Sequence, residues 1–396
     1  MNESIANTSF TPARLAGAVI GSLALMAGNA HAMNGAQLGG YGIKNAGMGG
    51  ASIALPLDAS AAANNPAGMA FVPNSFAQNF LLFRGQSSVS LFGNPLEDNT
   101  NVLAPEGGFN WVISPTMTAG LTASGSGAGV DFGKPAVPAP GAENVKASQK
   151  VAEIVSSVTW KVQPNLAIGL GLNLMVQQVS TQGVVVQPVP GMFVPVPGHG
   201  TQTATGFGAR IGVLWNASPE ISLGATYKTK TNMSQLGDYA NDVLAYSAGK
   251  IDIPSEYGIG LAWKATPTIT VAADYLQIQY AGIKANQDPA GPGWKDQPVF
   301  RLGVAWDVNS IWTLRGGLSS NQAQIESVRA AQNFMTPAIN DKSYTAGASM
   351  KLDNKADISF SIELNPSVTL DGSGPSTGVS ITSKTQVWRL GYQRAF

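Results

Sequence analysis

The chain has 396 residues, of which 44% are hydrophobic and only 12% charged, with 23 basic and 23 acidic side chains in balance. It is too apolar and too poor in charge for a disordered chain, and its neutral balance gives no reason to expect nucleic acid as a partner. It has no cysteine, which excludes disulfides and thiolate metal sites.

The first 32 residues have the pattern of a secretory signal peptide. Arg14 precedes an apolar run over 15–27, and Ala30 and Ala32 place small residues at the two positions that a signal peptidase reads. A membrane anchor is the alternative, but this run is too short to cross a bilayer. We therefore expect residues 1–32 to be a signal peptide that is removed after export.

Residues 33–73 are rich in Gly, Ala and Asn, with neither strict alternation nor a helical stripe. Their sharpest feature is a turn motif, Asn64-Asn65-Pro66-Ala67-Gly68. Asn before Pro favours an extended or turn conformation, and the glycine can supply a positive φ. A surface turn is the plain interpretation. More than 300 residues of short alternating strands follow, with no other candidate domain. We therefore expect residues 33–73 to form a hatch, or plug, that these strands enclose.

Beyond residue 73 the chain alternates between apolar side chains and small or polar ones. In residues 166–177 every even position is aliphatic, whereas the odd positions carry Ala, Gly, Asn, Met or Gln. A soluble β-sandwich would place large side chains inward and charges outward, yet the aliphatic face here has no Lys or Glu. Apolar side chains toward lipid and small or polar ones inward are typical of a transmembrane barrel. Several stripes end in Trp or Tyr, as at an interfacial girdle.

The alternation predicts an all-β protein: a 14-stranded antiparallel transmembrane β-barrel over residues 74–396. The segments are 74–92, 106–114, 116–126, 151–163, 165–181, 202–215, 219–233, 251–264, 268–281, 297–307, 311–320, 343–352, 356–366 and 383–396. Short turns and long loops alternate between them, as in outer-membrane barrels. The predicted long loops are 93–105, 127–150, 182–201, 234–250, 282–296, 321–342 and 367–382. The last strand ends on Phe396, which resembles the C-terminal signal of such barrels.

The sequence gives little support to catalysis. A barrel lipase needs a nucleophile with a histidine base, and the one histidine past the signal, His199, lies in a predicted outer loop between two glycines. No clustered His or carboxylate spacing suggests a metal site, and no glycine pair opens a helix as a phosphate cradle would. We expect no enzyme, no metal and no cofactor.

Together these features resemble the FadL family (OmpP1/FadL/TodX) of outer-membrane transporters for long-chain fatty acids and other hydrophobic compounds. The likeness is strongest at Asn65-Pro66-Ala67 and across the last third, at 253–261, 312–317, 336–339 and 343–345. It implies a hatch in the barrel lumen and a ligand that leaves sideways through an opening in the wall. The family's wall is perturbed near 116–126, where this chain carries several glycines, Gly120, Gly125 and Gly127.

We therefore expect a Gram-negative outer-membrane transporter for a fatty acid, an alkane or an aromatic hydrocarbon. Its other partners would be outer-membrane lipid and lipopolysaccharide, and we expect a monomer. Two alternatives stay open: a general diffusion porin, and a structural or adhesin barrel without transport. A porin would need more lumenal charge than this chain carries.

Two groups of residues are candidate ligand contacts. Four arginines point into the lumen by parity and could meet a carboxylate head group: Arg210, Arg301, Arg315 and Arg389. The alternative is that they pair with lumenal acids such as Asp274 and Glu363. An apolar outer loop is a candidate capture surface, with Val185, Met192, Phe193 and Val194. The alternative there is a loop tucked over the barrel mouth.

Overall fold

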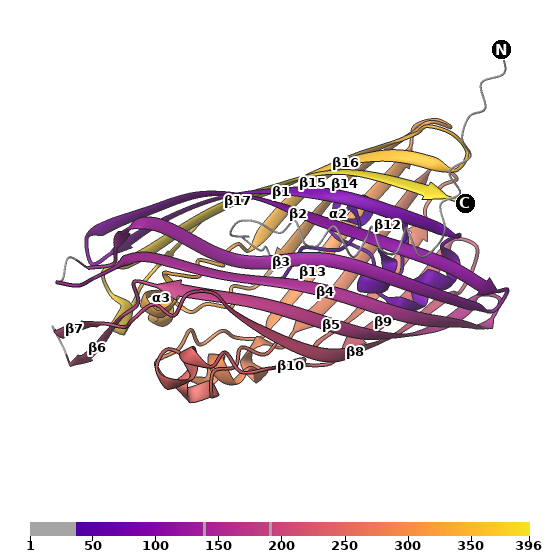
Figure 1. Ribbon diagram of the computed structural model, residues 1–396. Coiled ribbons are helices and arrows are strands. Elements are labelled where there is room, and N and C mark those ends of the chain that lie inside the picture. The colour runs from indigo at the N-terminus through magenta and orange to yellow at the C-terminus, as the bar shows by residue number, and fades with distance from the viewer. Residues whose placement is uncertain (1–36, 138–139, 190–191) are drawn as a thin grey trace, which may run out of the picture.

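The chain folds into a closed antiparallel β-barrel with a segment in its lumen (Figure 1). The computed structural model describes residues 37–137, 140–189 and 192–396, so the expected signal peptide lies outside the described residues. Fourteen strands form the wall: β1 (Ser75–Leu91), β2 (Asn94–Ser114), β3 (Met117–Pro135), β4 (Asn144–Gln163), β5 (Leu166–Gln182), β8 (Gln202–Asn216), β9 (Ile221–Lys228), β11 (Glu256–Lys264), β12 (Ile269–Ile278), β13 (Gln297–Asp307), β14 (Trp312–Asn321), β15 (Lys342–Lys351), β16 (Ala356–Asp371) and β17 (Val379–Ala395).

Closure of the barrel comes from pairing between the first and last strands, β1 and β17, over their full lengths. The predicted 14-stranded architecture is therefore confirmed. Smaller elements are β6 (Val185–Val189), β7 (Met192–Pro195), β10 (Asn232–Met233), α2 (Ile43–Ala46), α3 (Ala330–Asn333), η2 (Ala61–Ala63), η3 (Pro66–Phe71), η4 (Asp238–Asn241), η5 (Ala245–Ser247), η6 (Tyr280–Gly282), η7 (Lys284–Gln287), η8 (Ser327–Arg329) and η9 (Gly374–Ser376). Within the described ranges, none of the helices has the length and apolar character that a membrane span requires.

Some predicted long loops are wrong. Residues 93–105 are not a loop, because β1 and β2 meet at a tight turn in which Phe92 and Gly93 both have positive φ. Likewise, β3 runs on to Pro135 and β4 begins at Asn144, which shortens the predicted loop 127–150. In these extensions the outward side chains are small or polar, as in Asn99 and Asn101 of β2, so the sequence has the composition of a loop.

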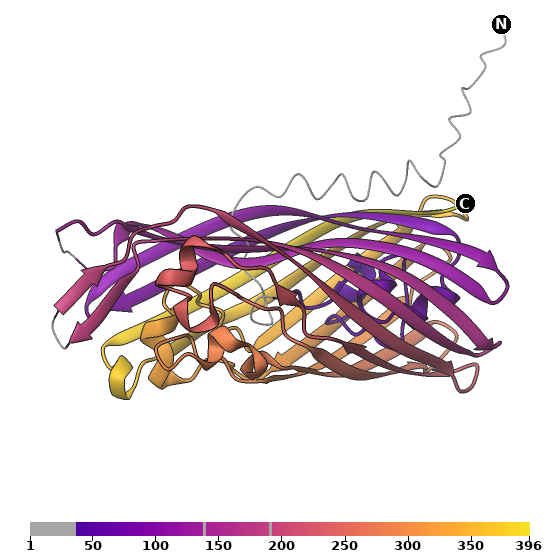
Figure 2. The same cartoon turned by 60° about the horizontal axis from the view of Figure 1, so that its bottom comes forward.

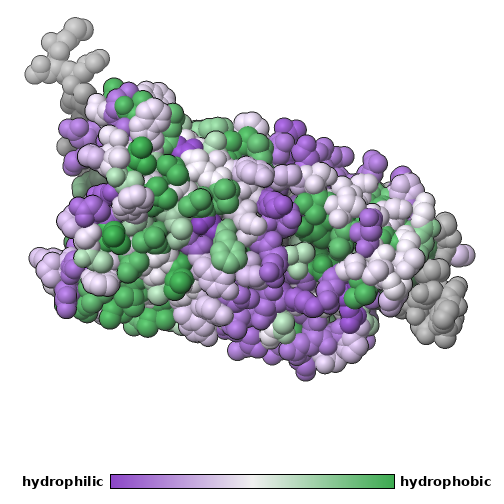
Figure 3. Space-filling view, turned by 180° about the vertical axis from the view of Figure 1, so that it is seen from behind, coloured by the Kyte–Doolittle hydropathy of each residue, from purple (hydrophilic) through white to green (hydrophobic). Residues whose placement is uncertain are grey.

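The outward face of the wall changes from apolar to polar within one row of residues. Leu82 on β1 lies opposite Leu103 on β2 and Trp388 on β17, and we name this the Leu82 row. The next outward residue of β1 is Arg84, and the one after it is Gln86. We call the part between the short turns and this row the membrane half, and the part toward the long loops the outer half. Figure 3 shows apolar side chains gathered over the left part of one face, the end that carries the short turns.

The inward face changes in the opposite sense. In the outer half, Val89 and Leu91 of β1 lie opposite Ile381 and Val379 of β17, and all four side chains are buried. They join an apolar cluster that includes loop residues such as Trp294 and Ile339. Figure 2 shows the short helices of the long loops gathered at this end of the barrel, away from the C-terminus.

The wall is incompletely paired between β2 and β3. Their register runs from Ser114–Met117 up to Gly107–Ala123 and ends there. Beyond it, β2 pairs with β1 and β3 with β4, and the described residues show no hydrogen-bonded register between the two strands. On β1, the level of Gly107 is that of Gln78, below the Leu82 row. This unpaired stretch therefore begins within the membrane half.

Candidate functional site: the hatch and the lumenal polar layer

The hatch, residues 37–73 as far as the structure describes it, lies in the lumen of the membrane half (Figure 1). The small inward residues of the wall allow it to pack closely. A Cβ added at Gly169 of β5 would lie 2.3 Å from the backbone nitrogen of Ala67, and one at Gly303 of β13 would lie 2.3 Å from the carbonyl oxygen of Met48. At these wall glycines, hatch backbone occupies the space that a side chain would fill. This explains why the inward-facing residues of these strands are so small.

Asn65 joins the hatch to itself and to the wall. Its side chain caps η3 by accepting from the Ala67 N–H at 3.0 Å, and its amide donates to the Ile53 carbonyl at 2.8 Å and to the Val213 carbonyl of β8 at 3.0 Å. Pro66 occupies the first turn of η3, where a missing N–H costs nothing. The Asn-Pro motif therefore connects two hatch segments and the wall through one amide side chain.

Gly68 has a different role from the one expected. It lies inside η3 without a positive φ, so the prediction of a left-handed residue is wrong. An added Cβ would lie 2.9 Å from Cβ of Pro56, so the position requires a small residue because two hatch segments meet there.

Asn64 and Tyr41 connect the hatch to a buried ion pair. The Tyr41 N–H donates to Asn64 Oδ1 at 3.1 Å, the Asn64 amide donates to the Tyr41 carbonyl at 2.9 Å, and the Tyr41 hydroxyl donates to Glu153 at 3.2 Å. Burial and the neighbouring Glu153 carboxylate raise the pKa of Tyr41 well above its usual range, so the hydroxyl keeps its proton. Arg210 contacts both the Asn64 carbonyl, at 3.5 Å, and Glu153, at 3.4 Å.

Two further wall carboxylates bind hatch backbone amides. Asp274 of β12 accepts from the N–H groups of Ser52 and Ile53 at 2.7 and 3.1 Å. Glu106 of β2 accepts from Gly42 N–H at 2.8 Å. Sequence reasoning considered Asp274 as a partner for an arginine and did not consider Glu106 at all. Its inward parity on β2 was the one available signal, and the predicted loop 93–105 ended just before it.

All four predicted arginines point into the lumen, but they differ in their partners. Arg389 forms an ion pair with Glu363 at 3.1 Å, as the alternative interpretation expected, and Arg210 pairs with Glu153. Arg301 donates to the Gly50 carbonyl of the hatch at 3.3 Å, and Arg315 donates to Ser349 at 2.6 Å. Within the part of the chain that the structure describes, Arg301 and Arg315 have no carboxylate within 4.0 Å.

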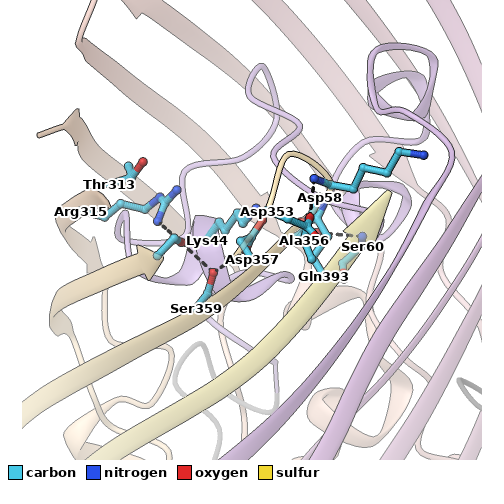
Figure 4. A network of polar contacts seen from close by, with 12 residues as sticks. Lys44, Asp58, Ser60, Thr313, Arg315, Asp353, Ala356, Asp357, Ser359 and Gln393 are labelled. Atoms are coloured by element: carbon cyan, nitrogen blue, oxygen red, sulfur yellow. Dashed lines mark hydrogen bonds and ion pairs between the residues drawn. The ribbon is translucent and has the colours of Figure 1, made fainter. Parts of the chain in front are cut away.

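Lys44 of α2 binds the hatch to the closing strands of the barrel (Figure 4). Its ammonium group lies 2.7 Å from Asp357 of β16 and 2.9 Å from Gln393 of β17. Asp357 also accepts from Ser359, which contacts Ser349 at 2.7 Å. The polar chain thus continues from the hatch, through β16 and β15, to Arg315 of β14.

Asp58 is the second charged residue of the described hatch, and it is fully enclosed. Its Oδ1 accepts from the Ser60 N–H at 2.8 Å, while Oδ2 has no partner among the described residues. Burial raises the pKa of this carboxyl group, against the opposing effect of Lys44. The hatch is therefore held by a few charged contacts within a layer of hydrogen bonds.

The other predicted residues lie outside this layer. The predicted capture loop forms a two-stranded hairpin, β6–β7, at the long-loop end, where Val185 packs against the apolar cluster of the outer half. His199 lies in the following loop, 2.5 Å from Asp242 and edge-on to Tyr239. Among the described residues, no group of three or more His, Asp or Glu side chains is placed to hold a metal ion.

A closed barrel with an apolar outer band and a hatch held in its lumen defines the class of outer-membrane transport barrels. The sequence profile of one family, outer membrane protein transport proteins (OMPP1/FadL/TodX), matches residues 23–396, and the chain belongs to this family of outer-membrane transporters of hydrophobic compounds. Its members are transport channels rather than enzymes. No curated protein matches the sequence significantly.

Several solved structures have the same fold. The Pseudomonas putida toluene transporter TodX aligns over 91% of this chain and 99% of its own, with a TM-score of 0.70 and 17% identity. A Pseudomonas aeruginosa FadL homologue aligns over 93% and 100%, with a TM-score of 0.68 and 17% identity. The Ralstonia pickettii toluene transporter TbuX aligns over 90% and 98%, with a TM-score of 0.65 and 17% identity. At this identity the likeness establishes the shared fold.

Proposed function

We propose that the protein takes up hydrophobic small molecules from outside the cell and releases them sideways into the outer membrane. One observation carries the proposal: the apolar interior of the outer half ends on a polar, hatch-filled layer, and β2 and β3 lose their pairing at that level. A ligand dissolved in the apolar interior would gain about 0.8 kcal/mol for each buried methylene. The polar layer below would oppose its passage, whereas the unpaired wall lies beside the lipid.

A general diffusion porin fits this arrangement less well. A porin needs an open, water-filled lumen, whereas here hatch backbone contacts wall strands from β5 to β13. Transport assays in proteoliposomes distinguish a hydrophobic-compound transporter from a porin. We expect purified protein to speed transfer of decane or toluene and to leave sugar-driven swelling at the level of empty vesicles. Swelling by sugars without hydrocarbon transfer would overturn the proposal.

For an anionic ligand, we propose that one of the four lumenal arginines meets the head group. Arg301 and Arg315 are the better candidates, because each contacts only neutral oxygen atoms among the described residues. Replacing each of the four arginines by Met should weaken decanoate binding more than decane binding for at least one variant. Equal losses for both ligands across all four would leave the arginines with a structural role only.

The hairpin β6–β7 is our candidate for first contact with the ligand. Val185 and Val194 are half-buried on either strand, and Val185 adjoins the apolar interior. Apolar surface left outside a core often marks a binding site. Deleting residues 185–195 should slow uptake at low ligand concentration while leaving the rate at saturation unchanged.

A further inference from the structure

The outward surface of strands β2, β1, β17 and β16 has a sharp boundary that the transport function does not use. At the Leu82 row, Leu82 and Leu103 are 39% and 50% exposed and Trp388 is 37% exposed, as expected for side chains in lipid. One row further out, Arg84 lies opposite Asn101 and Gln386. The next row places Gln86 opposite Asn99 and Lys384. Lipid head groups of the outer leaflet would therefore lie against these two rows.

A groove of about 200 Å³ lies on the outer side of this boundary and begins at the row of Gln86. Its lining is entirely polar. On the side of β1, β16 and β17 it consists of Gln86, Ser87, Ser88, Ser367, Thr382 and Lys384, and on the side of β2 of Asn99 and two carboxylates, Glu97 and Asp98. A β-bulge in β16 between Asn365 and Val368 brings Ser367 into the groove, beside Lys384. Bulges are built into strands at positions where side chains are re-aimed, and this one widens the surface at the level of the head groups.

One cation lines this groove and a second lies one row nearer the Leu82 row; neither forms an ion pair with a described carboxylate. Lys384 lines it, and Arg84 is the diagonal neighbour of Lys384 across the β1–β17 pair, a relation that spaces two residues by about 7–8 Å. In the described part of the chain, neither has a carboxylate within 4.0 Å. Lys146, exposed on the same outward side of β4, instead pairs with Asp131 at 2.9 Å.

We propose that this groove, which we call the Lys384 groove, binds the phosphorylated sugar head group of lipopolysaccharide in the outer leaflet. Arg84 and Lys384 would contact a phosphate group, because Arg and Lys are the side chains that bind phosphate most strongly. Hydroxyl and amide side chains supply donors and acceptors for sugar hydroxyls. The Leu82 row beneath would lie against the acyl chains. The carboxylates of Glu97 and Asp98 repel a phosphate at the β2 edge of the groove, so the phosphate belongs on the β17 side, beside Lys384.

The test measures binding of rough lipopolysaccharide to the full-length protein in dodecyl maltoside. We expect the double variant Arg84→Ala/Lys384→Ala to bind at least tenfold more weakly than the wild type. Lys146→Ala is the matched control, because its charge is already paired, and its affinity should stay within twofold. Glu97→Gln should bind as well as or better than the wild type. Dephosphorylated lipopolysaccharide should bind the wild type and the double variant equally weakly.

Two further arms identify what the groove recognises. Inorganic phosphate, added at about 10 mM, should displace little bound lipopolysaccharide. The reason is that the sugar and acyl contacts add to the affinity that the phosphate contact provides. Micelles containing phosphatidylglycerol should not compete either. Unchanged affinity of the double variant would overturn the proposal, and so would equal competition by phosphatidylglycerol, which would reduce the groove to a non-specific basic surface. Heat-modifiable migration and unchanged decane transfer would show that the variants are folded.

Discussion

In both the membrane half and the outer half of the barrel, apolar and polar side chains alternate along each strand. The apolar side chains face outward in the membrane half and inward in the outer half. On β17, Leu390 and Trp388 face outward in the membrane half while Arg389 faces inward. Ten residues toward the long loops, Ser380 faces outward and Ile381 is fully buried inside. Alternation therefore specifies a strand with two unlike faces, and only the surroundings decide which face is apolar. Where the two faces exchange, the wall leaves the membrane.

Each half needs a different filling for its lumen. In the membrane half, inward polar groups such as Asp274 and Glu106 are satisfied by backbone amides of the hatch. In the outer half, inward aliphatic groups are covered by loop side chains such as Trp294 and Ile339. An unpaired buried polar group costs about 1–3 kcal/mol, and a fully buried Val, Leu or Ile contributes about 1.5–3 kcal/mol. The hatch and the loops thus both fill the lumen, the hatch by hydrogen bonds to polar groups of the wall and the loops by covering its apolar side chains.

The largest expected effect comes from fixing the hatch in the membrane half. Ala67 of the hatch and Ala167 of β5 belong to one buried cluster, so a disulfide between Ala67→Cys and Ala167→Cys should hold η3 against the wall. If the hatch must move for a ligand to pass, oxidised protein should lose nearly all uptake and reductant should restore it. The single cysteine variants are the controls. Full uptake by the crosslinked protein would make the hatch a static filler.

The next effect tests where the outward face changes. Leu390, in the apolar band, is 58% exposed, and Leu390→Arg should destabilise the barrel in lipid vesicles by about 2–4 kcal/mol. Thr382→Arg, on the same face of the same strand in the outer half, should change the free energy of unfolding by less than about 0.5 kcal/mol. Urea unfolding in vesicles measures both. Equal losses would mean that the membrane extends further up the wall than the Leu82 row.

The strand count and the inward parity of the arginines could be predicted because both depend on local alternation. The outer part of β2 could not, because the inward Asp98 and the outward Asn99 differ too little in polarity to show two faces in the sequence. The wall residues that bind the hatch could not be predicted from the sequence either. Gly42 meets Glu106 and Ser52 meets Asp274 across long stretches of chain, through backbone amides that have no residue-specific signature.

The smallest expected effect compares one inward hydroxyl from each half. Ser359, in the membrane half, donates to Asp357 at 3.1 Å and contacts Ser349 at 2.7 Å, so Ser359→Ala should destabilise the barrel by about 1 kcal/mol. Ser87, in the outer half, is buried, and its hydroxyl has no partner among the described residues. Ser87→Ala removes a buried hydroxyl without a partner and should be neutral or stabilising by up to about 1 kcal/mol. Both variants delete one oxygen atom, so the opposite signs can be read from the same urea titration. If Ser87→Ala lost as much stability as Ser359→Ala, the interior of the outer half would be hydrated rather than apolar, and an apolar ligand would gain little by entering it.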